Sequence, residues 1–395
     1  MIYIHIPFCR SFCTYCSFYS EVAARCRKSE DVEFSEFSNA LCREISCRRD
    51  EISDKVNTLY IGGGTPSVLP LSVFSQVMSA LDDAGYGNPY DEFTVEVNPE
   101  DIVQKGEAYV EGLLRLGVNR ISMGVQSFDD NVLKFMNRRH DSLKARKAYA
   151  VLENAGVSNI SIDLIFGLPQ LSDTQWKETL EKALDISPSG RLPQHVSSYQ
   201  LSVEPDSMLE KLLDNGRWTE ASDEQCERQY DMLCSALSAS GYRHYEISNF
   251  ALPGFEAKHN SAYWKHVPYV GFGPGAHSFA SGGDILNCRQ AAVGPIRRWN
   301  RGDLKGYLEN PTGVWESEVL SDEQIALEKI MLALRTSDGI QESFLRLHCN
   351  PRNLERALAS GHLVPAGGPL GSDGIRLRIP ESRFFISDSI ITDIL

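Results

Sequence analysis

The sequence has little positive charge and no long apolar run. Its 395 residues contain 39 Lys and Arg against 53 Asp and Glu, a formal net charge of −14. Binding to the phosphate backbone of nucleic acids needs a basic surface, so this composition argues against a nucleic-acid partner. No apolar run approaches the roughly 18 residues that span a bilayer, and the first residues show no signal-peptide pattern. We therefore expect a cytoplasmic protein without a transmembrane segment.

The sequence also lacks internal repeats, low-complexity linkers and any regular spacing among most of its ten cysteines. Seven cysteines are scattered along the chain, and without a secretion signal we interpret them as reduced thiols. The other three are close together near the start of the sequence. The scattered cysteines are Cys26, Cys42, Cys47, Cys226, Cys234, Cys288 and Cys349.

Cys9, Cys13 and Cys16 follow a short strand-like run over residues 2–6. The spacing C-x3-C-x2-C brings together three soft thiolates, which favours an iron–sulfur cluster or zinc. A structural zinc site takes four ligands, and no second Cys or His pair follows at a suitable distance. A [4Fe–4S] cluster held by three thiolates leaves one iron open for another ligand. Zinc and a chance cluster of packed thiols remain the alternatives.

Strand and helix patterns alternate six times between residues 2 and 201, which predicts a parallel sheet with helical crossovers. In such sheets the active site lies at the carboxyl ends of the strands. Polar or unusual residues occur at or near the end of each predicted strand, so we expect one site on this rim. They are the cysteine loop, the glycine run 62–64, Asn98, Gln126, Asp163 and residues 199–200.

The alternation stops past residue 205. Residues 242–278 combine histidines, aromatic residues and a glycine-rich turn, which favours either a wall over a flat ligand or a packed loop region. From about residue 305 the patterns predict a small helical module, with a helix over 322–335 and a β-hairpin over 361–385, similar to a winged helix. We predict three segments: 1–205, 206–304 and 305–395.

The cysteine triplet, with Tyr15 before its third member, resembles the signature of the radical S-adenosylmethionine (SAM) superfamily. Further segments along nearly the whole chain resemble the oxygen-independent coproporphyrinogen III oxidase group of that superfamily. The resemblance implies an α/β fold, a partial parallel (β/α)6 barrel of radical SAM type with a small C-terminal α+β module like a winged helix. The matching segments are 3–18, 62–67, 96–99, 122–128, 162–169, 245–250, 259–264 and 273–278.

The resemblance also implies the ligands of two cofactors. Cys9, Cys13 and Cys16 would hold a [4Fe–4S] cluster, whose open iron binds SAM in this family. Glu96 and Arg138 offer opposite charges for the ammonium and carboxylate of SAM, although strand alternation alone would turn Glu96 towards solvent. No catalytic residue is assigned. The positions that match SAM contacts are Tyr3, Gly63, Gly64, Thr65, Glu96, Gln126, Arg138 and Asp163.

Within this group the sequence is more similar to a heme-chaperone branch than to the oxidases. The oxidase pattern has a further Cys two residues after the third, where this chain has Phe18, and an N-terminal extension that we do not expect here. The stretch 259–264 is similar to a feature of the chaperone branch. This resemblance implies binding of heme and its transfer to an unidentified acceptor protein, with His259 or His277 as candidate axial ligands. We expect His5 to pack within the first strand.

Two other functions stay open. The first is oxygen-independent coproporphyrinogen III oxidase activity, a radical SAM oxidative decarboxylation. The second is radical SAM chemistry on another substrate, among which nucleic acid is the least favoured because the chain is acidic. The sequence identifies no heme acceptor and leaves open whether the protein makes peripheral contact with membrane-bound acceptors.

Overall fold

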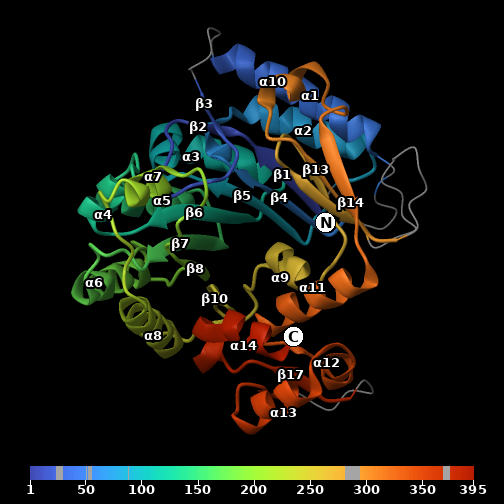
Figure 1. Ribbon diagram of the computed structural model, residues 1–395. Helices are drawn as coiled ribbons and strands as arrows, with labels where there is room; N and C mark the ends of the chain where they lie inside the picture. The colour runs from blue at the N-terminus through green and yellow to red at the C-terminus, as the bar shows by residue number, and fades with distance from the viewer. Residues whose placement is uncertain (24–29, 50, 52–55, 88, 281–293, 368–373) are drawn as a thin grey trace. The chain divides into compact units, whose positions relative to one another are not determined.

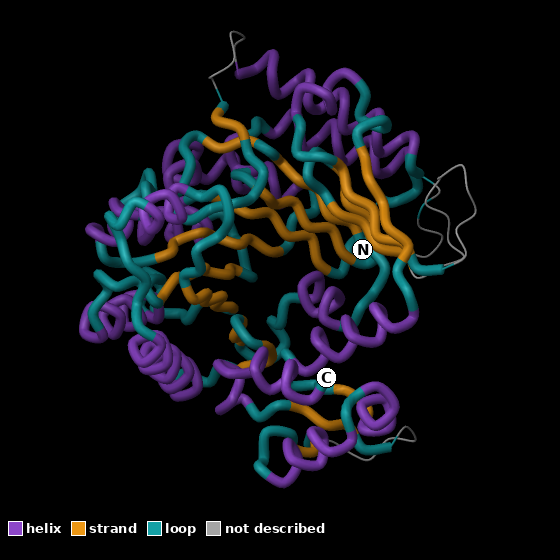
Figure 2. Tube along the Cα trace, viewed as in Figure 1, coloured by secondary structure: helices purple, strands orange, loops and turns teal. Residues whose placement is uncertain are grey.

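The computed structural model divides the chain into two compact units (Figures 1 and 2). Unit 1 comprises Met1–Gln229 and Pro268–Val319, and unit 2 comprises Tyr230–Val267 and Leu320–Leu395, so each unit combines two segments of the chain. The division near residues 205 and 304 that sequence rhythm indicates stays a prediction. The residues that the structure describes are 1–23, 30–49, 51, 56–87, 89–280, 294–367 and 374–395.

Some sequence predictions concern residues outside these ranges. Cys26 and Cys288 lie outside the described residues, and so do residues 368–373 within the predicted hairpin. The eight described cysteines are free thiols. In the described part of the chain, no helix combines the length and apolar character needed to cross a membrane.

A parallel sheet forms the core of unit 1. Six of its strands, from β1 to β8, lie side by side in the order of the chain and run parallel, and the alternating patterns predict such a parallel sheet. A further strand, β11, pairs in parallel with the other edge of β1 and was not anticipated. The predicted α/β class with a mostly parallel sheet is therefore confirmed. Across unit 1 the strands are β11 (Val270–Phe272), β1 (Ile2–Ile6), β4 (Thr58–Gly63), β5 (Glu92–Val97), β6 (Arg120–Gln126), β7 (Ile160–Phe166) and β8 (His195–Gln200).

Helices connect these strands, and several begin at caps that the sequence supplies. The side chain of Asn98 accepts a hydrogen bond from the backbone of Glu100 at the start of α3, and Ser172 forms a capping box with Gln175 at the start of α6. Figure 1 shows α1 and α2 together beside β1 and β4. The helices are α1 (Glu30–Cys47), α2 (Leu71–Asp83), α3 (Pro99–Arg115), α4 (Asp130–Phe135), α5 (Ser142–Asn154), α6 (Asp173–Leu184), α7 (Met208–Asp214), α8 (Asp223–Ala239) and α10 (Leu304–Glu309).

The two faces of the parallel sheet differ in chemistry. Successive side chains of a strand point to opposite faces, and one set consists of buried apolar residues such as Ile61, Val95 and Ile121. The other set is polar and in register across neighbouring strands: Glu96 is paired with Ser122. The strand order and register therefore gather polar groups on one face. The further register partners on this face are Tyr60 with Thr94, Thr94 with Arg120, Ser161 with His195, and Asp163 with Gly124 and Ser197.

The second segment of unit 1 adds a small antiparallel sheet with the order β12-β13-β14. A short parallel pair, β2 and β3, lies in the region of the cysteine loop. These elements bring residues from the middle of the chain against its first strand and first helix. Their bounds are β2 (Phe8–Cys9), β3 (Glu21–Val22), β12 (His277–Ala280), β13 (Ile296–Asn300) and β14 (Trp315–Val319).

Unit 2 contains the end of α8, an antiparallel pair β9 and β10, and a helical module with a three-stranded antiparallel sheet of order β15-β17-β16. Two of these strands form the predicted hairpin, but Glu381–Ile386 are a 3-10 helix (η2) instead of its continuation. The other elements are β9 (Arg243–Glu246), β10 (Asn249–Ala251), α9 (Lys258–Trp264), α11 (Asp322–Leu334), β15 (Ile340–Gln341), α12 (Glu342–His348), α13 (Pro351–Ala359), β16 (Val364–Pro365), β17 (Arg376–Arg378) and α14 (Ser387–Ile394).

Candidate cluster and cofactor site

The three clustered cysteines lie in the segment that follows β1, at the carboxyl end of that strand. Backbone contacts fix this segment. Thr14 donates from its backbone N–H to Met136 O (3.2 Å) and from its hydroxyl to Phe135 O (3.2 Å), and Asn137 donates to Phe12 O (2.7 Å). Because the backbone and neighbouring polar groups hold the segment, the thiols remain free to bind a ligand.

The three cysteines are half-buried. Thr65 donates a hydrogen bond to Cys9 Sγ (3.5 Å), and Arg138 Nη1 donates to Cys13 Sγ (3.3 Å). Burial raises the pKa of Cys9, and it raises the pKa of Cys16 to about 11. These thiols must therefore lose protons when they bind a metal centre.

The arrangement of these thiols also bears on the kind of metal centre. Among the described residues, no group of three or more Cys, His, Asp and Glu side chains is placed to hold a single metal ion. A cubane places its thiolates on different irons, so it does not require them to converge on one point.

The glycine run at the end of β4 permits close approach of the backbone to its surroundings. Gly63 has a φ of 106°, and a Cβ atom on it would lie 2.6 Å from the ring of His5. A Cβ on Gly64 would lie 2.7 Å from the carbonyl oxygen of Phe8, and one on Gly62 would lie 2.8 Å from the carboxyl of Glu96. Only glycine fits this cradle without displacing a neighbour.

Glu96 is turned inwards, so the expectation of solvent exposure from alternation alone is wrong. Its carboxylate accepts hydrogen bonds from the Tyr60 hydroxyl (2.6 Å) and from the backbone N–H of Gly63 (3.2 Å). Burial, together with the nearby charge of Asp163, raises the pKa of Glu96 to about 7. A cationic ligand group beside Glu96 would favour its ionised form.

Asp163 and Gln126 complete the polar rim on the next strands. Ser122 donates to the Asp163 carboxylate (3.2 Å), and burial raises the pKa of that carboxyl. Gln126 has a φ of 67°, a left-handed conformation that is costly for a residue other than glycine and that is concentrated at functional sites. A Cβ on Gly124 would lie 2.8 Å from Gln126 Nε2, so this strand end is also tightly built.

Arg138 has an unfilled hydrogen-bonding capacity. Its Nη2 donates to Gly124 O (2.7 Å) and its Nη1 to Cys13 Sγ, whereas its buried Nε has no hydrogen-bond partner among the residues that the structure describes. A buried donor without a partner is costly. A carboxylate is the ligand that best fits a guanidinium in this state, because it can accept two parallel hydrogen bonds.

A second arginine, Arg120, faces the same polar interior and was missed by the sequence reasoning. It is only 2% exposed, and its buried Nε has no hydrogen-bond partner within the described ranges. Its positive charge lowers the pKa of both Glu96 and Asp163 against the dominant effect of burial. The available signal was its position, since it precedes Ser122 and Gly124 at two-residue spacing on one strand.

Tyr3 and His5 lie on β1 next to this region. The Tyr3 hydroxyl contacts His5 Nδ1 (3.0 Å), and His5 Nε2 contacts Tyr19 O (2.8 Å). His5 is buried within the first strand, as expected. Tyr3 is paired in register with Tyr60, the hydroxyl donor to Glu96, so it belongs to the same polar surface.

The two histidines considered as heme ligands belong to different units. His259 is buried on α9 of unit 2, where its Nε2 lies 3.2 Å from the Tyr263 hydroxyl. His277 is exposed on β12 of unit 1 and stacks on Trp299 with a ring-centroid distance of 5.8 Å. Neither position by itself identifies a heme ligand.

Comparison with known proteins defines the class first. The family model of the Radical SAM superfamily matches residues 3–183. The E. coli coproporphyrinogen III oxidase HemN, a radical SAM enzyme, has the same fold: its structure aligns with 99% of this chain and 89% of its own length, with a TM-score of 0.77 at 20% identity. The chain therefore has the radical SAM fold, and this superfamily implies a [4Fe–4S] cluster and SAM.

Sequence relatives narrow the class to one family. The heme chaperone HemW of Synechocystis sp. is 32% identical over 338 residues, which cover 86% of this chain and 78% of the relative. The heme chaperone HemW of Bacillus subtilis is 34% identical over 345 residues, which cover 86% of this chain and 84% of the relative. The chain belongs to the HemW family of radical SAM proteins.

Proposed function

We propose that this protein is a heme chaperone, which binds heme and transfers it to an acceptor protein. The observation that carries the proposal is the similarity to heme chaperones named HemW over most of both chains. The geometry of unit 1 supports a cofactor-binding protein, because free thiols, a glycine cradle and an arginine with an unfilled donor surround one polar surface.

Cys9, Cys13 and Cys16 would hold the [4Fe–4S] cluster. When bound, the cluster supplies a site for one-electron transfer and an open iron for SAM. The thiols fit this role because the backbone of their segment is fixed by its contacts with residues 135–137. Arg138 adds a positive charge beside Cys13, which offsets the negative charge that a thiolate-bound cluster brings.

The surrounding residues would hold SAM by complementary charge and shape. Arg138 would donate to its carboxylate, and Glu96 would accept from its ammonium group. Asp163, oriented by Ser122, would accept from the ribose hydroxyls. The remaining proposed contacts are Tyr3, Gly63, Gly64, Thr65 and Gln126.

The fold alone does not separate a chaperone from an oxidase, because HemN shares it. The distinguishing residue on this chain is Phe18, which is 70% exposed where the oxidase pattern has a cysteine. An exposed phenylalanine beside the cluster segment offers an apolar contact and no thiolate. The missing cysteine favours the chaperone over the oxidase.

The decisive experiment is an anaerobic titration of hemin into cluster-reconstituted protein, followed by its visible absorption. We expect a shifted Soret band that saturates near about one heme per chain, and transfer of that heme to an added apo-acceptor such as an apocytochrome. Absence of saturable binding would overturn the proposal. Conversion of coproporphyrinogen III propionates to vinyl groups under reducing conditions would support the oxidase instead.

A further inference from the structure

His5 connects the proposed SAM site to the segment that returns from the three cysteines. It is 5% exposed on β1, and both of its ring nitrogens are engaged. Nδ1 lies 3.0 Å from the Tyr3 hydroxyl, and Nε2 lies 2.8 Å from the backbone oxygen of Tyr19. Both distances are those of good hydrogen bonds. The positions of the protons in these two bonds determine what Tyr3 can offer to a ligand.

The partner of Nε2 determines the tautomer of His5. The carbonyl oxygen of Tyr19 can only accept a hydrogen bond, so Nε2 carries the proton and donates it. Burial lowers the pKa of His5, so the imidazole is neutral at neutral pH and Nδ1 keeps its lone pair. Tyr3 must then donate its hydroxyl proton to Nδ1. The Tyr3 oxygen therefore has only lone pairs to offer in any further contact.

Close packing holds His5 in this orientation. A Cβ atom on Gly63 would lie 2.6 Å from the imidazole, so the ring lies directly against the glycine cradle. Tyr19 is fixed in turn, because its hydroxyl accepts a hydrogen bond from the backbone N–H of Leu304 (2.6 Å). The ring of Tyr19 also lies against Gly302, where a Cβ atom would approach it to 2.8 Å. The acceptor of the Nε2 proton is therefore held in place.

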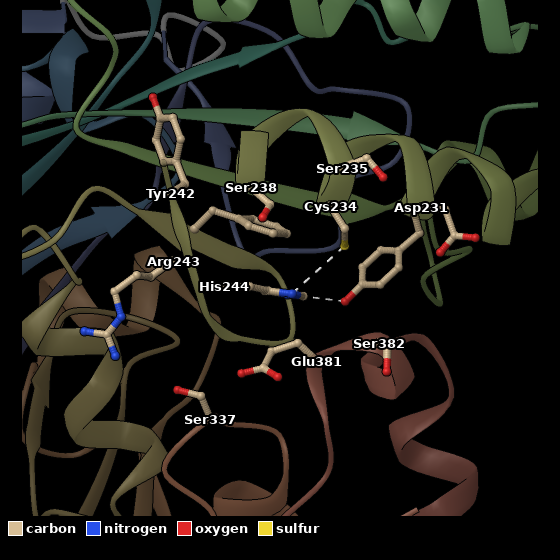
Figure 3. A pocket seen from close by; sticks show the side chains of 12 residues that line it. Asp231, Cys234, Ser235, Ser238, Tyr242, Arg243, His244, Ser337, Glu381 and Ser382 are labelled. Atoms are coloured by element: carbon tan, nitrogen blue, oxygen red, sulfur yellow. Dashed lines mark hydrogen bonds between the residues drawn. The ribbon is translucent and has the colours of Figure 1, made fainter. Parts of the chain in front are cut away.

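His244 of unit 2 is a buried histidine with a less defined environment. It lines a pocket of about 560 Å³, and Figure 3 shows its imidazole directed towards Cys234 and Tyr230. Nδ1 lies 4.0 Å from Cys234 Sγ, and Nε2 lies 3.4 Å from both the Tyr230 hydroxyl and Ile247 O. Contacts of this length constrain the tautomer only weakly. The two short contacts of His5 fix its tautomer.

We propose that His5 is a positioning residue of the SAM site, which turns the hydroxyl proton of Tyr3 away from the ligand so that Tyr3 meets SAM as a hydrogen-bond acceptor. The inference rests on the proposed contact between Tyr3 and SAM. Tyr3 then favours the donor groups of SAM, such as its ammonium, and opposes its carboxylate. The guanidinium of Arg138 offers only donors and takes the carboxylate. The two residues together set the orientation of bound SAM.

Two substitutions of His5 separate this role from a structural one. In His5→Gln the amide nitrogen takes the place of Nε2 and can still donate to Tyr19 O, but the acceptor for Tyr3 is lost. In His5→Asn the amide oxygen takes the place of Nδ1 and can still accept from Tyr3, but the bond to Tyr19 is lost. Calorimetric titration of cluster-reconstituted protein with SAM should show the weaker binding in His5→Gln, by roughly threefold to tenfold relative to wild type. A purely structural role of His5 predicts the reverse order.

Tyr3→Phe tests whether His5 acts through Tyr3. This variant removes the hydroxyl and keeps the ring, and we expect it to weaken SAM binding by a similar factor. The double variant Tyr3→Phe/His5→Gln should bind SAM no more weakly than Tyr3→Phe alone, because the two residues act as one unit. Losses that multiply in the double variant would overturn the positioning role. His348→Gln, at an exposed histidine of unit 2, is the control and should bind SAM like wild type.

Nitrogen NMR of cluster-reconstituted protein with isotope-labelled histidine measures the tautomer directly and needs no SAM. We expect a neutral His5 with its proton on Nε2, and the signal that is lost in His5→Asn identifies this residue. A proton on Nδ1 would contradict the inference. Equal SAM affinities of wild type and His5→Gln would also contradict it and leave the SAM site intact. Absence of SAM binding to cluster-loaded wild-type protein would overturn the proposed SAM site itself, and the role of His5 with it.

Discussion

Arg48 and Arg138 are two arginines of unit 1 whose guanidinium groups have opposite surroundings. All three nitrogens of Arg48 donate: Nε to Glu51 (2.9 Å), Nη1 to Glu44 (2.6 Å) and Gly271 O (2.7 Å), and Nη2 to Glu51 (2.7 Å) and Ser278 (3.0 Å). Arg138 has a thiol and one carbonyl as partners, and its Nε has none among the described residues.

This difference distinguishes a buried arginine that stabilises the fold from one that is available to bind a ligand. Around Arg48 the carboxylates are shared with further donors: Glu44 also accepts from Tyr307 (2.7 Å) and Asn300 (2.8 Å), and Glu51 accepts from Arg298 (3.0 Å). Every nitrogen of Arg48 is thus partnered, and the network joins α1 to the second chain segment of unit 1. The surroundings of Arg138 are incomplete until a ligand supplies acceptors, which is the state expected of a preorganised site.

The largest expected effect comes from the thiols beside Arg138. Replacing Cys9, Cys13 and Cys16 together by Ala should abolish the cluster, because no other described thiol lies in this segment. Iron and sulfide analysis and the visible spectrum after reconstitution measure this loss. Cys349→Ala, in unit 2, is the control and should keep full cluster content. Retention of a cluster by the triple variant would contradict the assignment.

The next effect concerns the network of ions around Arg48. Arg48→Met leaves Glu44 and Glu51 buried without their main cation, so we expect the free energy of unfolding to fall by about 3–5 kcal/mol. Urea denaturation of the apo-protein measures this change. An effect below about 1 kcal/mol would show that the network is not the structural element inferred here.

Arg138→Met should weaken the binding of SAM and leave the free energy of unfolding nearly unchanged. Loss of a charge-assisted pair of hydrogen bonds to a ligand carboxylate costs about 1.5–3 kcal/mol, or roughly 10- to 150-fold in SAM affinity. The stability of the apo-protein should change little, because no carboxylate loses its partner. Calorimetric titration with SAM, set beside the urea curve, sharpens the comparison with Arg48. A stability loss as large as that of Arg48→Met would remove the distinction.

The smallest effect is a pH dependence at Glu96. Its folded pKa of about 7 exceeds the ordinary 4.5. The carboxyl therefore stabilises the fold at low pH, and this contribution is lost as the pH rises towards and through about 7. SAM affinity should increase several-fold over the same window as Glu96 ionises beside the ligand ammonium. Glu96→Gln should flatten both profiles, and an unchanged SAM profile in this variant would refute the role of Glu96.

Much of the fold was predictable because it depends on local patterns. Strand and helix periodicity in the first two hundred residues predicted the parallel strands with helical crossovers, and Cys9, Cys13 and Cys16 follow the first of these strands. The strand β11 was not predictable in this way. Its three residues, Val270–Phe272, become a strand only by pairing with β1 far away in the chain.

In the candidate site, too, some residues were predictable from local patterns and others depend on neighbouring strands. The glycine run and Gln126 stand out at strand ends, but the orientation of Glu96 depends on the Tyr60 hydroxyl of a neighbouring strand. No sequence motif marks Arg120, and its role is evident only from its charge interactions with Glu96 and Asp163 on adjacent strands.

The pairing of β1 with β11 has a consequence for synthesis of the protein. The first strand to leave the ribosome stays unpaired on one side until residues 270–272 have been made. At about 5–20 residues per second, this takes tens of seconds. The segment with Cys9, Cys13 and Cys16 begins directly after that strand, so one edge of the strand that carries it is completed only late in translation. Cluster insertion is therefore expected to follow completion of the chain, when the three thiols already have their final arrangement.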